Sequence, residues 1–236
     1  MSREELSNSF IETFKPYSFR NWDKKLFEVS QPYYEVRIDT LELVTLVTNQ
    51  HKFLIKERSL DEFEFFKNLK DLIKKEFNGN KFFAKFFTRS AKDIEVIYDC
   101  PYELMDCFLS SMRVFEDMCV VRNATKDTEQ IVIYIRPLVE FDKKNEYRLF
   151  YVNGFTSVCN YHKQDAKEIH SSIIDSDILQ WNEERIKPFV GVVDYCIDFI
   201  KHNDRIELIE INPYNLSDPI LLDHTKFSVE NQQIKY

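Results

Sequence analysis

Two apolar runs near the end of the chain, at 195–200 and 205–211, are separated by a short polar stretch at 202–205. Runs of this length around a polar break are typical of two antiparallel strands joined by a turn. We therefore expect a β-hairpin here, and any fold of this chain must contain an antiparallel sheet that includes it.

The second strand of this hairpin ends in polar side chains. Side chains two residues apart in a strand point to the same face of the sheet. Glu210 and Asn212 are therefore expected on the face that also carries Ile206 and Leu208. The apolar character of that face gives way to oxygen-bearing groups at its end.

These oxygens predict a metal site. If the loop consists of residues 203–205, Asp198 lies directly opposite Glu210, with the two Cβ atoms about 5 Å apart. Facing like charges destabilise a sheet unless a positive group lies between them, and Mg²⁺ prefers carboxylate and carbonyl oxygens. The alternative is a solvated rim in which Asn212 and Pro213 form only a turn.

A single lysine, Lys85, lies within an aromatic run at 82–87 that is expected to form a strand. Burying an unpaired ammonium group costs several kcal/mol, so a lysine in a buried strand usually meets an anion. Phosphate is one candidate. The alternative is that Lys85 lies on an edge strand and extends its ammonium group to solvent.

The chain has only three glycines, Gly79, Gly154 and Gly191, in 236 residues. This excludes the glycine-rich phosphate loops of P-loop proteins, dinucleotide-binding folds and protein kinases. If a nucleotide binds, side chains must hold its phosphates.

Charge and composition exclude further classes. The net charge of −8 argues against a protein whose main task is non-specific nucleic-acid binding. Five cysteines without metal-binding spacing are expected to be free thiols in a reducing compartment. No long apolar run or signal peptide is seen. We expect a cytoplasmic protein with no membrane partner.

Helices and strands can be placed along the rest of the chain. Capping boxes at 2–5 and 59–62 predict that helices begin there, and Pro101 predicts the start of another helix that continues through Met112. Asn153 and Gly154 predict the turn of a hairpin. Strands are expected at 34–38, 82–87, 130–135, 146–152 and 155–158.

Together these motifs resemble the cell-division-cycle-123 family of ATP-grasp proteins, over nearly the whole chain. The resemblance is carried, in chain order, by the opening segment 19–27, Lys85, Arg89-Ser90-Ala91-Lys92-Asp93, Tyr134-Ile135-Arg136-Pro137, Glu146-Tyr147-Arg148-Leu149-Phe150, Asp198, Glu210-Ile211-Asn212-Pro213-Tyr214 and Ser217-Asp218-Pro219. Two positions depart from the family pattern. Glu210 stands where aspartate is common, and Ala91 stands where proline is usual.

The resemblance implies an α+β, ATP-grasp-like fold in which two lobes with mainly antiparallel sheets enclose a nucleotide cleft. The apolar pattern breaks at 123–129. We therefore expect an amino-terminal lobe at 1–125 with the Lys85 strand, and a carboxyl-terminal ATP-grasp lobe at 126–236 with the metal-bearing strands.

The resemblance also implies roles for individual residues. Lys85 and Arg148 resemble cations on the phosphates, and the strand before Pro137 resembles the connection beside the adenine. The expected nucleotide-binding residues are Lys85, Ser90, Lys92, Tyr134, Ile135, Arg136, Glu146, Arg148 and Asp198, and the expected Mg²⁺ ligands are Asp198, Glu210 and Asn212.

By resemblance, the protein is expected to bind Mg²⁺ and ATP and to help assemble translation initiation factor 2 through its gamma subunit. An alternative is an ATP-dependent ligase that activates a carboxylate or an RNA end. Only under that alternative is nucleic acid an expected partner. A third possibility is an ATP-binding regulator without turnover, and the sequence leaves open whether ATP is hydrolysed. Trp22 and the Tyr33-Tyr34 pair are candidates for a partner-binding surface.

Under each hypothesis, Asp198→Ala or Lys85→Ala is expected to weaken Mg²⁺-ATP binding without unfolding the chain.

Overall fold

The computed structural model describes the whole chain except residues 95, 162–175, 203–204 and 218–236. The chain divides into two compact units. The first unit comprises Met1–Arg20 and Pro32–Val139, and the second comprises Asn21–Gln31 and the chain from Glu140 onward.

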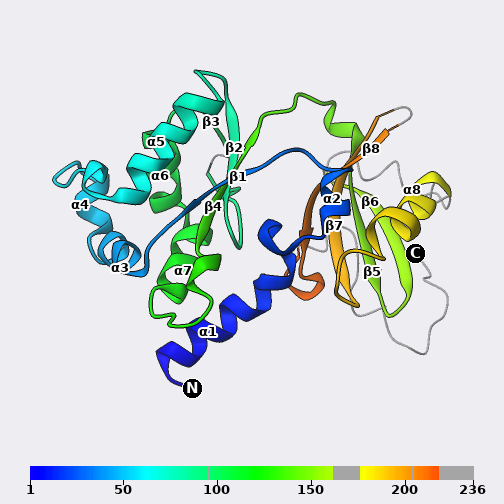
Figure 1. Cartoon of the computed structure of the whole chain (residues 1–236), viewed down its shortest axis with the longest axis horizontal. Helices are drawn as coiled ribbons and strands as arrows, with labels where there is room; N and C mark the ends of the chain where they lie inside the picture. Colours follow the sequence, from blue (N-terminus) through cyan, green and yellow to red (C-terminus); the bar gives the residue numbers. More distant parts are fainter. Residues whose placement is uncertain (95, 162–175, 203–204, 218–236) are drawn as a thin grey trace. The chain divides into compact units, whose positions relative to one another are not determined.

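The first unit is built on a four-stranded antiparallel sheet with helices packed against it (Figure 1). Its strand order is β1-β4-β2-β3. The strands are β1 (Tyr34–Arg37), β2 (Phe82–Phe86), β3 (Ile97–Tyr98) and β4 (Val132–Pro137), and the helices are α1 (Arg3–Phe14), α3 (Thr40–Thr48), α4 (Gln50–Leu54), α5 (Glu64–Glu76), α6 (Pro101–Ser110) and α7 (Met112–Val121).

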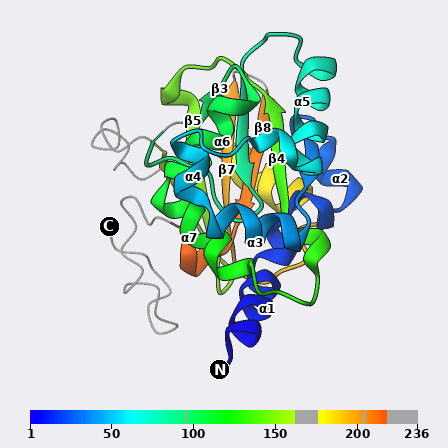
Figure 2. The same ribbon diagram turned by 90° about the vertical axis from the view of Figure 1, so that its left-hand side faces the viewer.

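One face of this sheet forms the core of the first unit. The rings of Phe82 and Tyr98 on that face pack against Phe77 at the end of α5 and Phe108 of α6. Helices α4 and α7 pack on α6, and α3 packs on α7 and α4 (Figure 2). The opposite face of the sheet is therefore the one that can carry polar groups, and it includes Lys85.

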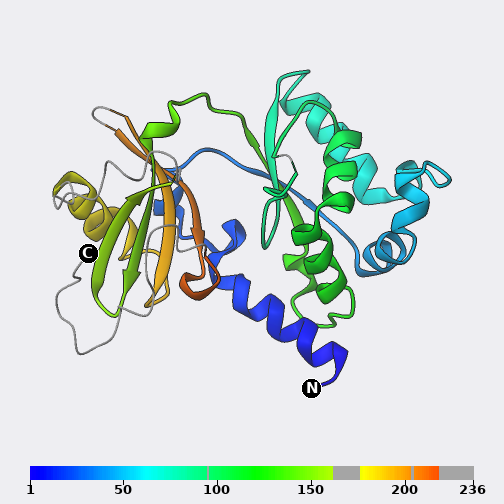
Figure 3. The same cartoon turned by 180° about the vertical axis from the view of Figure 1, so that it is seen from behind.

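The second unit contains another four-stranded antiparallel sheet, with strand order β6-β5-β7-β8. Its elements are α2 (Lys24–Phe27), β5 (Glu146–Val152), β6 (Phe155–Asn160), α8 (Ser176–Trp181), a π-helical turn (Asn182–Ile186), β7 (Tyr195–His202) and β8 (Arg205–Asn212). Helix α8 lies along one face of this sheet (Figure 3), where Trp181 packs on Phe199 and the Tyr195 hydroxyl donates to Asn182 at 2.9 Å.

The segment Asn21–Gln31 belongs to the second unit because it extends the second sheet. Ser30 forms a parallel bridge with Leu208 of β8, whose backbone N–H donates to the Val29 carbonyl at 2.7 Å. The chain thus leaves the first unit after Arg20 and returns to it at Pro32, before the first strand, β1, begins.

This division differs from the expected boundary between residues 125 and 126. Strand β4 follows that boundary in sequence, yet it pairs with β1 and β2 in the first unit. The structural division falls instead at 139–140, after β4.

Several local predictions are confirmed. Ser2 caps α1 through the expected capping box with Glu5, and α6 begins at Pro101. Asn153 and Gly154 both have positive φ, as a two-residue hairpin turn requires.

One boundary is wrong in each of two predicted helices. Ser59 caps only a short 3₁₀ turn, and α5 begins at Glu64, whose N–H donates to the distant Glu42 carboxylate at 2.5 Å. The helix from Pro101 ends at Ser110, because Ser111 caps a new helix. Met112 is consequently 71% exposed rather than packed on the sheet. Among the described residues, no helix combines the length and apolar character needed to cross a membrane.

Candidate functional site

The β7–β8 hairpin places Asp198 directly opposite Glu210, as predicted. The strand register that brings them together differs from the expected one. The strands already pair at His202 and Arg205, so the connection is shorter than the predicted three-residue loop. Regular pairing from there would put Asp198 opposite Ile209. A β-bulge shifts the register between Phe199 and Asp198, skips Ile209 and restores the opposition of the two carboxylates.

The bulge also changes which residues share the carboxylate face. Directly opposite residues of an antiparallel pair lie on one face, and Ile200 is opposite Glu207. Glu207 therefore lies on the face of Glu210, whereas Leu208, opposite Phe199, lies on the helix-covered face. The prediction that Leu208 shares the face of Glu210 is wrong, because it assumed an unbroken strand.

A buried ion pair lies on the carboxylate face. Arg148 of β5 is directly opposite Asp198, and its Nε and Nη2 donate to the two Asp198 oxygens at 2.6 and 2.8 Å. Arg148 is 4% exposed and Asp198 is 1% exposed. Burial acts to lower the pKa of Arg148, but the charge of Asp198 and its hydrogen bonds outweigh burial and raise it. Arg148 is therefore charged.

The expected residues of the second unit gather on this one face. Glu146 and Arg148 are two apart on β5, and Asp198 faces both Arg148 and Glu210. Asn212 follows on the same face, opposite Cys196. Burial raises the pKa of the Cys196 thiol, which is thus a neutral packing group.

The oxygen donors here suit a hard divalent cation. Asp198 and Glu210 offer carboxylates and Asn212 an amide carbonyl, the ligand types that Mg²⁺ prefers. Arg148 already occupies both Asp198 oxygens, but a carboxylate oxygen can accept more than one bond. The residues therefore fit Mg²⁺, with Asp198 shared between the cation and Arg148.

Sequence reasoning missed Glu207, which is 4% exposed on the same face. Its carboxylate accepts a hydrogen bond from the Gln31 amide and pairs with Arg205 at 3.2 Å. These contacts hold it within the sheet. Only knowledge of the bulge could have placed Glu207 beside Glu210.

In the first unit, the open face of the sheet carries two buried cations. Lys85 of β2 is opposite Tyr134 of β4, and Arg136 follows two residues later on β4. Lys85 and Arg136 are 5% and 4% exposed, so the alternative in which Lys85 extends to solvent from an edge strand does not hold. Strand β2 lies between β4 and β3.

Two residues of the expected adenine-side strand, Tyr134 and Ile135, form contacts that stabilise the first unit. Ile135 points to the helix-covered face, since it is opposite Ala84, and its strand is paired on both sides. The Tyr134 hydroxyl shares a hydrogen bond with the Ser18 hydroxyl and accepts one from the Arg20 N–H. Burial raises the pKa of Tyr134, so its phenol is neutral.

The loop after β2 is anchored on α7. Arg89 donates to both oxygens of Asp117, at 2.9 Å from Nε and 2.5 Å from Nη2, and Thr88 donates to the same carboxylate at 2.5 Å. Within this loop the predicted residue Ser90 is buried and Lys92 is exposed.

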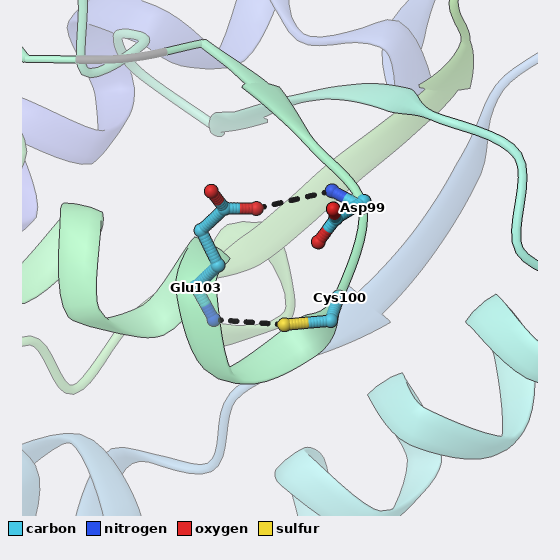
Figure 4. A group of neighbouring side chains, drawn as sticks. All are labelled: Asp99, Cys100 and Glu103. Atoms are coloured by element: carbon cyan, nitrogen blue, oxygen red, sulfur yellow. Dashed lines mark hydrogen bonds between the residues drawn. The ribbon is translucent and has the colours of Figure 1, made fainter.

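A separate cluster of possible metal ligands lies at the start of α6. One donor atom each from Asp99, Cys100 and Glu103 lie within 4.8 Å of one another. Figure 4 shows that Glu103 accepts from the Asp99 N–H and that the Cys100 sulfur accepts from the Glu103 N–H. These are helix-capping contacts, and they account for the cluster without a metal.

Comparison with known proteins identifies the fold. No protein-family model and no curated protein sequence matches this chain. The structure of Cdc123 from Schizosaccharomyces pombe matches with 17% identity and a TM-score of 0.58, over 89% of this chain and 88% of that one. The structure of C-terminally truncated Cdc123 from the same organism matches with 19% identity and a TM-score of 0.61, over 94% of both chains.

The chain has the Cdc123 fold. This confirms, at the level of the fold, the family resemblance seen in the motifs, and it confirms the predicted α+β class with two mainly antiparallel sheets. The Cdc123 fold does not by itself assign roles to side chains. Of the expected motif at 217–219, residues 218 and 219 lie outside the described part of the chain.

Proposed function

We propose that this protein binds Mg²⁺-ATP and acts as an assembly factor for translation initiation factor 2, through the gamma subunit of that complex. The observation that carries the proposal is the near full-length match to Cdc123, combined with a buried Arg148–Asp198–Glu210 array. A sheet rarely buries two facing carboxylates unless a cation binds to them.

The proposal gives each unit its own task. Asp198, Glu210 and Asn212 would hold Mg²⁺, which supplies charge neutralisation for phosphate oxygens. Lys85 and Arg136 of the first unit are cations of the kind that bind phosphate oxygens. Positioning and charge neutralisation are the main requirements of phosphoryl chemistry, so these residues suit nucleotide binding with or without turnover.

Nucleotide binding is tested by calorimetry with Mg²⁺-ATP, in magnesium and in EDTA. We expect wild-type affinity to fall when magnesium is removed. Glu210→Gln should lose this magnesium dependence, while Lys85→Met should bind more weakly in both buffers and keep it. Glu207→Gln is the matched control, since this neighbouring carboxylate is held by Gln31 and Arg205, and its affinity should equal that of wild type.

Absence of wild-type binding would overturn the nucleotide site. So would Glu210→Gln and Glu207→Gln behaving alike. Asp198→Ala is unsuitable as a site test, because it would leave the Arg148 charge buried and destabilise the chain. This revises the sequence-based expectation that the variant would stay folded.

The partner is tested by mixing the purified chain with purified initiation-factor gamma subunit. We expect a stable complex on gel filtration, which also implies a cytoplasmic location. Formation of a labelled product from ATP and a carboxylate or RNA acceptor, without gamma-subunit binding, would replace the assembly role with the ligase alternative.

A further inference from the structure

An aromatic ring from the end of β6 lies against the buried Arg148–Asp198 pair. The Arg148 Cζ is 4.8 Å from the centroid of the Tyr161 ring. The Nε and Nη2 of the same guanidinium donate to the two Asp198 oxygens. Arg148 therefore contacts a ring and a carboxylate at once.

The pairing of β5 and β6 places this ring on the face of Arg148. Asn160, the last residue of β6, is directly opposite Tyr147. The next N–H, that of Tyr161, donates to the Glu146 carbonyl at 2.9 Å and so continues the pairing. Tyr161 is thus the diagonal neighbour of Arg148, and diagonal neighbours are within reach of aromatic and long side chains.

The backbone that carries the ring is fastened to the start of β5. The Asn160 side chain is buried, and its Nδ2 donates to the Lys144 carbonyl at 2.9 Å. This bond and the Tyr161 N–H bond hold the end of β6 on both sides of Glu146. The position from which the ring projects is therefore defined by the sheet.

The ring and the carboxylate restrict different rotations of the guanidinium. A guanidinium donates hydrogen bonds within its plane and contacts aromatic rings through its face. Because Asp198 accepts from two N–H groups of Arg148, the orientation of Arg148 sets the direction of the remaining Asp198 lone pairs. That direction matters to Mg²⁺, which demands a nearly ideal octahedral arrangement of its ligands.

We propose that Tyr161 is a positioning residue, which orients the Asp198 carboxylate toward the bound Mg²⁺ by holding Arg148. This inference rests on the proposed Mg²⁺-ATP site. It assigns the residue that follows β6 a part in the strength of metal binding, although its ring contacts Arg148 and not the metal ligands.

The test compares the affinity for ATP in magnesium with that in EDTA, measured by calorimetry. Tyr161→Leu removes the ring, and the ratio of the two affinities should fall by about 10-fold, the lower end of the usual effect of residues that orient metal ligands. The affinity in EDTA should stay unchanged. Tyr161→Phe keeps the ring and should keep the wild-type ratio.

The matched control is Tyr147→Leu. This variant removes a ring from the same strand pair on the opposite face of the sheet, where Tyr147 stacks on Phe199 at 5.6 Å. A general loosening of the sheet would lower both affinities together, so Tyr147→Leu should keep the wild-type ratio.

A second measurement, without nucleotide, is the urea unfolding midpoint. Tyr161→Leu should lower the midpoint in the wild-type background. It should lower the midpoint less in the Asp198→Leu/Arg148→Met background, which lacks the guanidinium that the ring contacts. Shifts of equal size in the two backgrounds would contradict the positioning role.

The calorimetry separates failure of this inference from failure of the proposed function. An unchanged ratio in Tyr161→Leu, or an equal fall in Tyr147→Leu, would overturn the inference and leave the proposed Mg²⁺-ATP site standing. A wild-type protein without magnesium-dependent ATP binding would overturn both.

Discussion

A bidentate arginine–aspartate pair lies in each unit, and these two pairs differ in how far their arginine is buried. In Arg148–Asp198 of the second unit, the side chains are 5% and 2% exposed. In Arg89–Asp117 of the first unit, the arginine side chain is 34% exposed and the aspartate 2%. The geometry of the hydrogen bonds is similar, so burial is the variable that separates them.

The difference teaches what each pair can do. If either Arg148 or Asp198 is removed, the charged group of the other stays buried and cannot turn to water. The fold therefore needs both charges, or another charged group in place of the missing one. Such a pair suits a site where a cation binds beside it. Arg89 can turn to solvent, so Arg89–Asp117 suits the anchoring of a surface loop to α7.

The largest expected effect comes from breaking the fully buried pair. Asp198→Ala and Arg148→Met should each lower the free energy of unfolding by about 3–5 kcal/mol, because either removes one charge of a buried ion pair. Urea unfolding followed by circular dichroism measures both. The losses should be nearly equal, since both partners are buried.

The control for this prediction is the double variant Asp198→Leu/Arg148→Met. It removes both charges and should recover much of the stability that each single change loses. A double variant as unstable as the sum of the singles would show that the two side chains matter through packing and not as an ion pair.

The half-exposed pair should respond unequally to the loss of its two members. Arg89→Met leaves Asp117 buried with only the Thr88 hydroxyl among the partners described above, and should cost about 2–3 kcal/mol. The same unfolding assay applies. A cost equal to that of Arg148→Met would remove the distinction between the two pairs.

Asp117→Ala should cost less, about 1 kcal/mol, because the freed Arg89 guanidinium can extend to water. This order is the reverse of what a count of hydrogen bonds suggests, since Asp117 accepts from both Thr88 and Arg89. If Asp117→Ala proves the costlier change, the loop is held by the aspartate's hydrogen bonds and not by relief of its buried charge.

The β7–β8 hairpin shows which features of the site the sequence could predict and which it could not. The pairing of Asp198 with Glu210 was predictable in outline, because two apolar strands and a short polar break leave few registers. The route was not. The bulge lies where Leu208 pairs with Val29 and Ser30, residues far away in sequence whose approach no local pattern reveals.

Long-range placement also explains the other differences. A motif predicted that Ser59 would start a helix, but the amide groups at the start of α5 are capped by Glu42. Lys85 was predictable as a buried cation from its aromatic neighbours in sequence. Its contact with Phe19 was not, because that ring comes from a segment outside the strand and meets the lysine only in the folded unit.

The smallest expected effect concerns Asp93, at the other end of the loop that Arg89 anchors. Partial burial acts to raise the pKa of Asp93, but hydrogen bonds from the Ser111 hydroxyl and the N–H groups at the start of α7 outweigh it and lower the pKa. An anion near a helix amino terminus is worth about 0.5 kcal/mol.

A lowered pKa in the folded state means that Asp93 stabilises the fold above its unfolded pKa, near 4, and that this stability is lost as the pH falls through the folded value. Asp93→Asn should therefore be less stable than wild type by about 0.5 kcal/mol at pH 7, and the two should converge as the pH falls through the folded pKa of Asp93. Unfolding midpoints in urea across this pH range measure the difference. A gap that persists in acid would show that the anchoring at this end depends on hydrogen bonds alone, whereas a gap that closes places charge at both ends of the loop.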